Sequence, residues 1–286
     1  MKGKVISTIG GVYDVYLNHQ IIKVKPLGIL KHKKIKIIVG DEVEVSIEEK
    51  TLIDVYPRKN VLIRPRISNI DLGVIVMSLT KPNYSSYLLD KFLTLLNLSQ
   101  IKPLIILTKS DLISNQEEIE KIKNQYSLLG VKVLSYSKIT LEGLDEIKKE
   151  ISNKTIALMG QTGVGKSSLI NLLDENYQRA EGEFSKALGR GKHQTKEVVL
   201  LPYLGGFLGD TPGFSSLELN IFKEDLAEHF PLFNNYYTDC KYSNCLHQNE
   251  PGCKIKELLE KKLIDKENYD NYLLLLNELK PRKDRF

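Results

Sequence analysis

Long apolar runs are missing from this chain of 286 residues. Its densest apolar stretch, residues 272–276, is far below the roughly 18 residues that a membrane-spanning helix needs. The N-terminus also lacks the apolar core of a secretion signal, because Gly10, Gly11, Asp14 and Asn18 interrupt it. These absences predict a protein without a membrane anchor and, by default, a cytoplasmic location.

Cysteine is scarce, and all three cysteines lie between residues 240 and 253. An odd number of clustered cysteines in a chain without a secretion signal argues against disulfides and for reduced, metal-binding thiols. Cys240, Cys245, His247 and Cys253 form a Cys₃His set that suits tetrahedral Zn²⁺. Because no fifth ligand is in view, the pattern predicts one closed, structural zinc site per chain. The alternative is a group of reduced thiols without a metal.

A strong overall charge is also absent, since the net charge is only +5, but the charge is unevenly distributed. Residues 1–66 hold 13 Lys and Arg against 7 Asp and Glu, a net of +6, whereas the rest of the chain carries −1. A basic run at residues 31–36 lies within this excess. A solvated loop would explain that run alone, but a whole basic segment favours a polyanion as partner.

Residues 1–66 are expected to be all-β. Five short β-rich runs in about 60 residues suit a small closed barrel of the OB type, which often binds oligonucleotides. An SH3-like barrel is the alternative. The expected strands are residues 5–9, 13–17, 20–24, 34–39 and 42–47.

From residue 70 the pattern alternates between apolar strands and amphipathic helices, which is typical of a parallel α/β sheet. We therefore expect a multidomain α/β protein. It comprises a barrel at residues 1–66, a Rossmann-like P-loop domain at 67–219 and a helical zinc-binding module at 220–286. Strands are expected at residues 72–79, 104–107, 131–134, 155–159, 198–201 and 206–208, and helices at 84–98, 114–130, 144–151, 168–173, 255–264 and 267–279.

A complete G-x-x-x-x-G-K-S phosphate-binding loop follows one predicted strand and opens a helix. Its glycines let the backbone amides approach phosphates closely, and the helix adds its positive N-terminal end. Lys166 is expected to reach the β- and γ-phosphates, and Ser167 to bind Mg²⁺. The predicted phosphate-binding residues are Gly160, Gln161, Thr162, Gly163, Val164, Gly165, Lys166, Ser167 and Ser168.

A second motif, Thr108-Lys109-Ser110-Asp111, has the form of a guanine reader. Asp111 can accept two hydrogen bonds from guanine, which adenine cannot supply, and Lys109 can lie over the base plane. Thr108 replaces the commoner asparagine, so a side-chain amide contact to the phosphate loop is lost. Taken alone, the motif could equally be a helix-capping aspartate.

A third motif, Asp210-Thr-Pro-Gly213, has the form of the D-x-x-G sensor. Asp210 is expected to hold Mg²⁺ and the Gly213 amide to contact the γ-phosphate. Phe214 stands where Ras-like GTPases carry the glutamine that orients water. In the basic segment 185–195, Thr195 is expected to bind Mg²⁺ when GTP is bound. His193 is a candidate to orient water or contact RNA. A solvated loop histidine is the alternative for His193.

These motifs occur in an unusual order. The guanine reader at residues 108–111 precedes the phosphate loop at 160–167, whereas ordinary GTPases carry it downstream. Ser137 and Lys138, after the next strand, resemble the S-A-K loop that backs the base. Because a three-dimensional site does not depend on where the chain begins, the order predicts a circularly permuted GTPase domain.

Together, the basic barrel, the permuted GTPase and the zinc module resemble the ribosome small-subunit-dependent GTPase A (RsgA-type) family over essentially the whole chain. Specific marks are residues 160–168, 190–193 with Thr195, 210–214 and 240–253. The resemblance implies an OB-fold domain, GTP hydrolysis stimulated by the small ribosomal subunit, and a role in late maturation of that subunit. The chain departs from the family pattern at two positions. Thr108 stands in the guanine motif in place of the commoner asparagine, and Gln194 stands where members commonly carry threonine.

The expected ligands and partners are GTP or GDP with Mg²⁺, and the small ribosomal subunit with its rRNA, bound by a monomer. The rival interpretation is a non-ribosomal RNA-binding NTPase, but Asp111 argues against ATP. A zinc-dependent enzyme is a third possibility, and it would need an open metal position.

Overall fold

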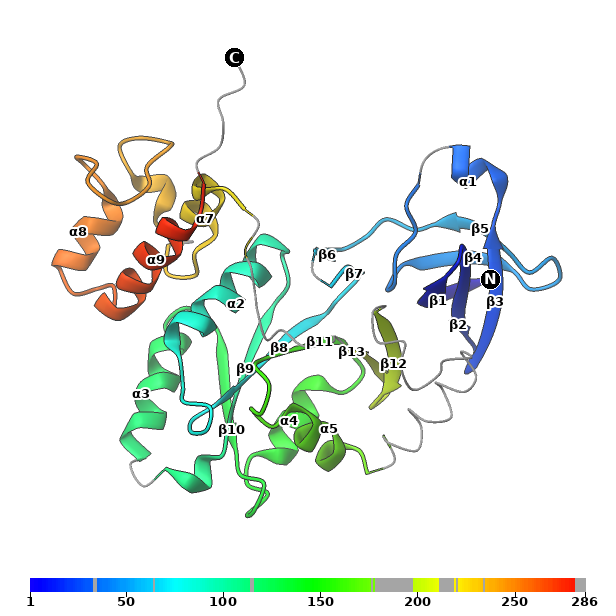
Figure 1. Ribbon diagram of the computed structural model, residues 1–286, viewed down its shortest axis with the longest axis horizontal. Helices are drawn as coiled ribbons and strands as arrows, with labels where there is room; N and C mark the ends of the chain where they lie inside the picture. Colours follow the sequence, from blue (N-terminus) through cyan, green and yellow to red (C-terminus); the bar gives the residue numbers. More distant parts are fainter. Residues whose placement is uncertain are drawn as a thin grey trace.

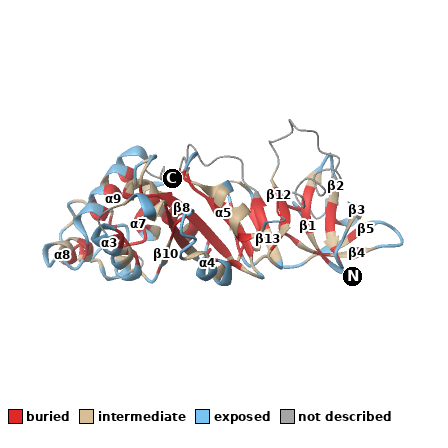
Figure 2. Ribbon diagram, turned by 90° about the horizontal axis from the view of Figure 1, so that it is seen from below, coloured by how far each residue is buried: buried red, intermediate tan, exposed pale blue. Residues whose placement is uncertain are grey.

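The computed structural model describes residues 1–32, 35–63, 65–113, 116–175, 177, 198–210, 219, 221–233 and 235–280. Three bodies lie in a row, with a central sheet between a barrel at one end and a helical module at the other (Figure 1). The same row, turned by 90°, shows buried strands running through the centre and the barrel (Figure 2). Within the described residues, every helix is too short or too polar to cross a bilayer.

The N-terminal body is a closed five-stranded barrel with the strand order β1-β2-β3-β5-β4. Strands β1 and β4 close it antiparallel, and β3 runs parallel to β5. The interior is filled by alternate apolar residues such as Val5, Val15, Val43 and Leu52, which confirms the expected barrel. The strands are β1 (Lys2–Ile9), β2 (Val12–Leu17), β3 (Gln20–Pro26), β4 (Glu42–Ser46) and β5 (Thr51–Val55).

The prediction of a strand at residues 34–39 is wrong. A short helix, α1 (Gly28–His32), precedes an irregular segment, and the missing strand is β5 instead. The consecutive residues Ile37, Ile38 and Val39 are all buried, which an alternating strand with one solvent face does not allow. The backbone N–H of Ile38 donates to the Asp41 carboxylate at 2.8 Å, so a side chain satisfies it in place of a strand ladder.

The central body is a six-stranded sheet with the order β10-β9-β8-β11-β13-β12, parallel except for the edge strand β12. All seven residues of β8 are buried, as expected for a parallel strand covered on both faces. The strands are β8 (Leu72–Ser78), β9 (Pro103–Thr108), β10 (Lys132–Tyr136), β11 (Thr155–Met159), β12 (Val199–Tyr203) and β13 (Gly206–Asp210). The helices are α2 (Ser86–Leu98), α3 (Gln116–Ser127), α4 (Leu144–Ile151) and α5 (Lys166–Leu173).

The barrel is held against the β12–β13 edge of this sheet. The ring of Tyr16 meets that of Phe207 edge-on, with centroids 5.3 Å apart, and the Lys4 ammonium lies 5.7 Å from the Phe207 centroid. A short ribbon, β6 (Val61–Leu62) and β7 (Ile67–Ser68), joins the two bodies. Its Ser68 hydroxyl donates to the fully buried Asp41 at 2.6 Å, so the ribbon is fixed to the barrel.

The C-terminal body contains α7 (Lys223–His229), α8 (Lys254–Glu260) and α9 (Lys266–Glu278). The last two confirm the expected helices, with slightly shifted ends, whereas α7 was not expected. The carboxylate of Asp265 caps α9 by accepting the Glu267 and Asn268 N–H groups. Helix α9 packs along α2, so the C-terminal body rests on the central sheet's own helix layer (Figure 1).

A buried carboxylate joins these two bodies. Asp90 of α2 is 1% exposed and accepts hydrogen bonds from the side-chain amides of Asn268 and Asn271 on α9, at 2.8–3.0 Å. The hydroxyl of Tyr126 on α3 donates to the same carboxylate at 3.0 Å. Burial raises the pKa of Asp90 to about 7, although these hydrogen bonds act in the opposite direction.

The raised pKa of Asp90 predicts a pH-dependent stability. The folded protein holds this proton more tightly than the unfolded chain, so the free energy of unfolding falls as pH rises from about 4 to about 7. One such group contributes at most about 1.4 kcal/mol per pH unit. We expect Asp90→Asn to remove this part of the slope in denaturant titrations between about pH 4 and 7. Identical slopes for the variant and the wild type would contradict the prediction.

Candidate nucleotide-binding site and metal centre

The predicted nucleotide motifs converge on one edge of the central sheet. The guanine motif begins at the carboxyl end of β9, residues 137–138 follow β10, the phosphate loop follows β11, and β13 ends at Asp210. These four strands are mutually parallel, so their carboxyl ends meet at the same edge. Ligands of open α/β sheets bind at such an edge.

The phosphate loop is wrapped tightly between β11 and α5. Gly160 has a φ of +139°, and a Cβ there would lie 2.3 Å from the Val76 carbonyl oxygen, so only glycine fits. Gly163 and Gly165 also have positive φ values. The Lys166 ammonium is half-buried and donates to the carbonyls of Gly160 and Gln161 at 2.5 and 2.7 Å. Burial lowers its pKa, and an anion placed in the loop would offset that cost.

The other residues predicted to bind phosphate lie in the loop itself and in the first turn of α5. Thr162 is exposed and Val164 is buried beneath the loop. Ser167 and Ser168 lie in the first turn of α5, where free backbone N–H groups and the helix dipole favour an anion.

The guanine motif is tied directly to the phosphate loop. Thr108 is buried, and its hydroxyl donates to the Val164 carbonyl at 2.6 Å. The amide contact is absent as expected, but the shorter hydroxyl restores a bond to the loop. Lys109 has a left-handed backbone (φ +62°), and its ammonium donates to the carbonyls of Gly163 at 3.1 Å and Thr80 at 3.2 Å.

The other residues predicted to bind the base lie in two loops, and they include an exposed carboxylate. Ser110 and Asp111 lie in a short 3₁₀ turn (Ser110–Leu112), and Asp111 is exposed. The Ser137 hydroxyl accepts the N–H groups of Ile139 and Thr140 at 3.1 Å and so orders the loop after β10. Lys138 is exposed in that loop.

The structure does not describe every residue of the predicted site. His193, Thr195, Gly213 and Phe214 lie outside the described residues, as does Ser114, the first residue of the helix expected at 114–130. For Asp210 the described feature is its backbone, at the end of β13.

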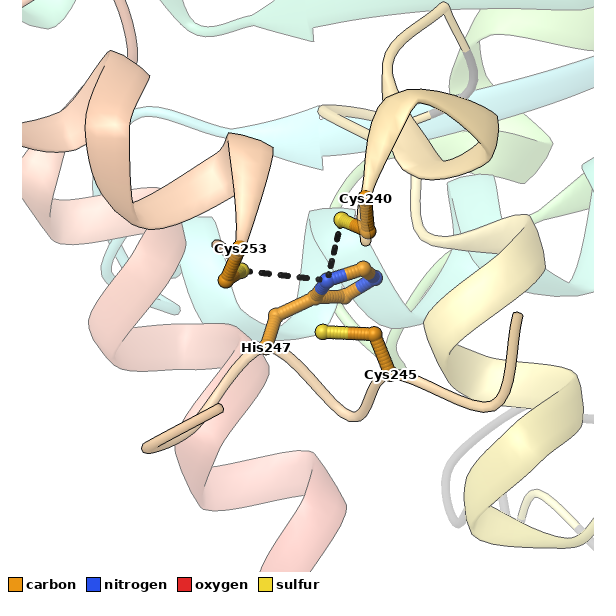
Figure 3. A group of neighbouring side chains, drawn as sticks. All are labelled: Cys240, Cys245, His247 and Cys253. Atoms are coloured by element: carbon orange, nitrogen blue, oxygen red, sulfur yellow. Dashed lines mark hydrogen bonds between the residues drawn. The ribbon is translucent and has the colours of Figure 1, made fainter. Parts of the chain in front are cut away.

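The metal-binding pattern is assembled as predicted. The ligand atoms of Cys240, Cys245, His247 and Cys253 all lie within 4.8 Å of one another and point toward a common centre (Figure 3). The Nδ1 atom of His247 is 3.5 Å from the Sγ atoms of both Cys240 and Cys253. A tetrahedral zinc ion with ordinary bond lengths places nitrogen and sulfur ligands about 3.5 Å apart, so the residues fit a metal ion.

The pKa values of the ligand residues follow from their burial. Burial raises the pKa of Cys245 to about 12 and also raises that of Cys253, and the nearby Cys240 thiol adds to both effects. Burial lowers the pKa of His247, although the Ala227 carbonyl and Glu250 act against it. A neutral imidazole and buried thiols suit a site that binds a metal ion.

Sequence reasoning did not identify the residues that hold the ligand loop in shape. The Glu250 carboxylate accepts N–H groups from Leu246, Gln248 and Asn249 at 2.8–3.0 Å. Two tyrosines of α9 fix the loop from below, because Tyr269 donates to the His247 carbonyl and Tyr272 to that of Leu246, both at 2.7 Å. The sequence signal for this support was Glu250, an acidic residue between the ligands His247 and Cys253. The tyrosines gave no signal, because they lie 22 and 26 residues from the carbonyls to which they donate.

Comparison with known proteins identifies the architecture. The family model for the RsgA GTPase matches residues 55–220, and that for the RsgA N-terminal domain matches residues 2–52. The chain belongs to the RsgA GTPase family. The "Small ribosomal subunit biogenesis GTPase RsgA" of Caldanaerobacter subterraneus subsp. tengcongensis is 37% identical, over 100% of this chain and 98% of that protein. The "Small ribosomal subunit biogenesis GTPase RsgA 2" of Oceanobacillus iheyensis is 39% identical, over 100% and 99%.

Solved structures agree with the family. YloQ, described as a circularly permuted GTPase, is 34% identical with a TM-score of 0.80, over 100% of this chain and 96% of its own. YjeQ from Thermotoga maritima is 30% identical with a TM-score of 0.82, over 97% and 98%. The predicted permuted fold is thereby confirmed.

Proposed function

We propose that this member of the RsgA GTPase family binds and hydrolyses GTP as a late assembly factor of the small ribosomal subunit. The observation that carries the proposal is the full-length match to relatives named for biogenesis of that subunit, on a chain whose nucleotide motifs converge at one sheet edge. The rival, a non-ribosomal RNA-binding NTPase, shares the nucleotide site but needs no ribosomal subunit.

Each of the three bodies has a separate role in this proposal. Residues 1–66, with a net charge of +6, bind ribosomal RNA mainly through phosphates. Residues 67–219 bind and hydrolyse GTP, and residues 220–286 form the metal module. The separate apolar core of the barrel supports this division, although Ile6 and Val39 pack into the larger central core. The factor acts as a monomer.

Each motif has a proposed role in nucleotide binding. Asp111, Lys109 and the loop after β10 bind guanine, while the loop from Gly160 to Ser168 holds the phosphates of GTP or GDP. Mg²⁺ is bound by Ser167, Thr195 and Asp210, and the Gly213 amide contacts the γ-phosphate. The Cys₃His centre holds one structural zinc ion, since all four of its ligands come from the protein and leave no open position.

The proposed catalytic cycle depends on the subunit, because Phe214 cannot orient water. Subunit binding brings His193 toward the γ-phosphate, and hydrolysis then releases the factor. We expect purified small subunits to raise kcat at least about tenfold over the free protein, rather than merely to lower KM. Steady-state GTPase assays with and without subunits test this.

His193→Ala should keep GTP and subunit binding but lose most of that stimulation. His229→Ala, which changes a helix-terminal histidine of α7, is the matched control. Full stimulation of the His193 variant would assign water positioning to another group. A wild-type rate that ignores small subunits but responds to other RNA would favour the rival function.

A further inference from the structure

Tyr136 lies at the nucleotide edge without belonging to any of the motifs. It is the last residue of β10 and the direct cross-strand partner of Thr108 at the end of β9. Its side chain is 3% exposed. Because β9 and β10 are parallel and in this register, Tyr136 stands beside the first residue of the guanine motif.

The Tyr136 hydroxyl lies close to the phosphate loop. It lies 3.8 Å from the point that a Cβ on Gly165 would occupy, and the Thr108 hydroxyl lies 3.9 Å from the same point. Two hydroxyls from neighbouring strands therefore lie beside Gly165, the last glycine of the phosphate loop. Among the described residues, the Tyr136 hydroxyl makes no hydrogen bond, whereas that of Thr108 already donates to Val164.

Three side chains of the guanine motif, those of Thr108, Lys109 and Asp111, offer no free donor to a guanine base. Guanine presents two adjacent acceptors, O6 and N7. An ionised Asp111 only accepts, the Lys109 ammonium is shared among main-chain carbonyls, and the single Thr108 proton is used. An asparagine in place of Thr108 would bring two N–H donors, which this chain lacks.

The Tyr136 hydroxyl keeps its proton under all ordinary conditions. Burial raises the pKa of Tyr136 to about 12, and the negative charge of Asp111 adds to the effect.

We propose that Tyr136 is a guanine-binding residue whose hydroxyl donates a hydrogen bond to the O6–N7 edge of the base. It thereby supplies the donor that Thr108 cannot. The inference rests on the proposed binding of GTP and adds a specificity residue to that site.

Tyr136→Phe removes the hydroxyl alone and tests the inference. Titration calorimetry should show GDP and IDP binding weakened by the same factor, about three- to tenfold, because inosine keeps both O6 and N7. The preference for GDP over IDP, which depends on the exocyclic amine and Asp111, should not change. The double variant Thr108→Asn/Tyr136→Phe should regain most of the lost affinity, because the amide restores a donor beside the base.

Tyr203→Phe is the matched control. Its hydroxyl donates to the Ile170 carbonyl at 2.9 Å, so its loss should lower the melting temperature without a change in base affinity. Unchanged GDP affinity in Tyr136→Phe would overturn the inference while GTP binding stands. Weakened affinity that Thr108→Asn fails to restore would also overturn it, by showing a packing role. A wild type that binds neither GDP nor GTP would instead overturn the proposed function.

Discussion

Loss of the metal from the Cys₃His centre is expected to unfold the C-terminal module while the central sheet stays folded. Cys245 and Cys253 are buried in an apolar core that they share with Ile255, with Tyr272 and with the central sheet. Without an ion, the loop between residues 240 and 253 is held by Glu250, by the two tyrosines and by a bond from the Lys241 N–H to the Gly252 carbonyl. Structural zinc sites in small domains supply about 10–16 kcal/mol of apparent binding free energy, which exceeds the stability of a module this size.

Elemental analysis of protein purified without added metal should find about one zinc ion per chain. Cys245→Ala should lose the ion, and hydrogen exchange should then show loss of protection in α7, α8 and α9 but not in β8 or β11. Because the thiols must release protons to bind, metal affinity should rise with pH. Lys241→Ala, an exposed change in the same loop, is the control. A metal-free wild type with a protected α9 would contradict the prediction.

Features written in contiguous residues were predictable. The phosphate loop, the metal ligands and the largely apolar strand β8 each depend on a local pattern whose physical meaning does not change with context. The order of the motifs was equally informative, because it excluded an ordinary GTPase connectivity before any strand was placed. The guanine motif was weaker, and its assignment is supported by the bond from Thr108 to Val164.

Features that depend on register or on distant partners were not predictable. Residues 34–39 have the composition of a strand, yet the barrel uses Ile37 and Ile38 as consecutive buried residues and takes its fifth strand from residues 51–55. The carboxylate of Asp90 finds its amide donors 178 and 181 residues away. Nothing in a single sequence joins such positions, since tertiary packing alone decides which polar residue is buried and what satisfies it.

Exchange of one carboxylate oxygen for an amide at Asp111 is expected to change the base that this GTPase accepts. Asp111 is exposed and, among the described residues, makes no hydrogen bond, so both its oxygens are free to accept from a ligand. Guanine offers a ring N–H and an exocyclic amine on that edge. Hydrogen bonds to a charged group contribute about 1.5–3 kcal/mol each, so Asp111→Asn should weaken GTP about 10²- to 10⁴-fold.

Xanthine carries a carbonyl where guanine carries the amine, so the side-chain amide that Asp111→Asn introduces can donate to it. Competition calorimetry with GTP and XTP should therefore show a reversal of preference rather than a uniform loss. Asp145→Asn, at an exposed position in the first turn of α4, controls for the change in charge. A reversal of base preference would place guanine on the turn after β9. It would thereby support a guanine motif that precedes the phosphate loop in the chain. Unchanged GTP affinity in the Asp111 variant would leave that carboxylate as a helix cap and the base reader unidentified.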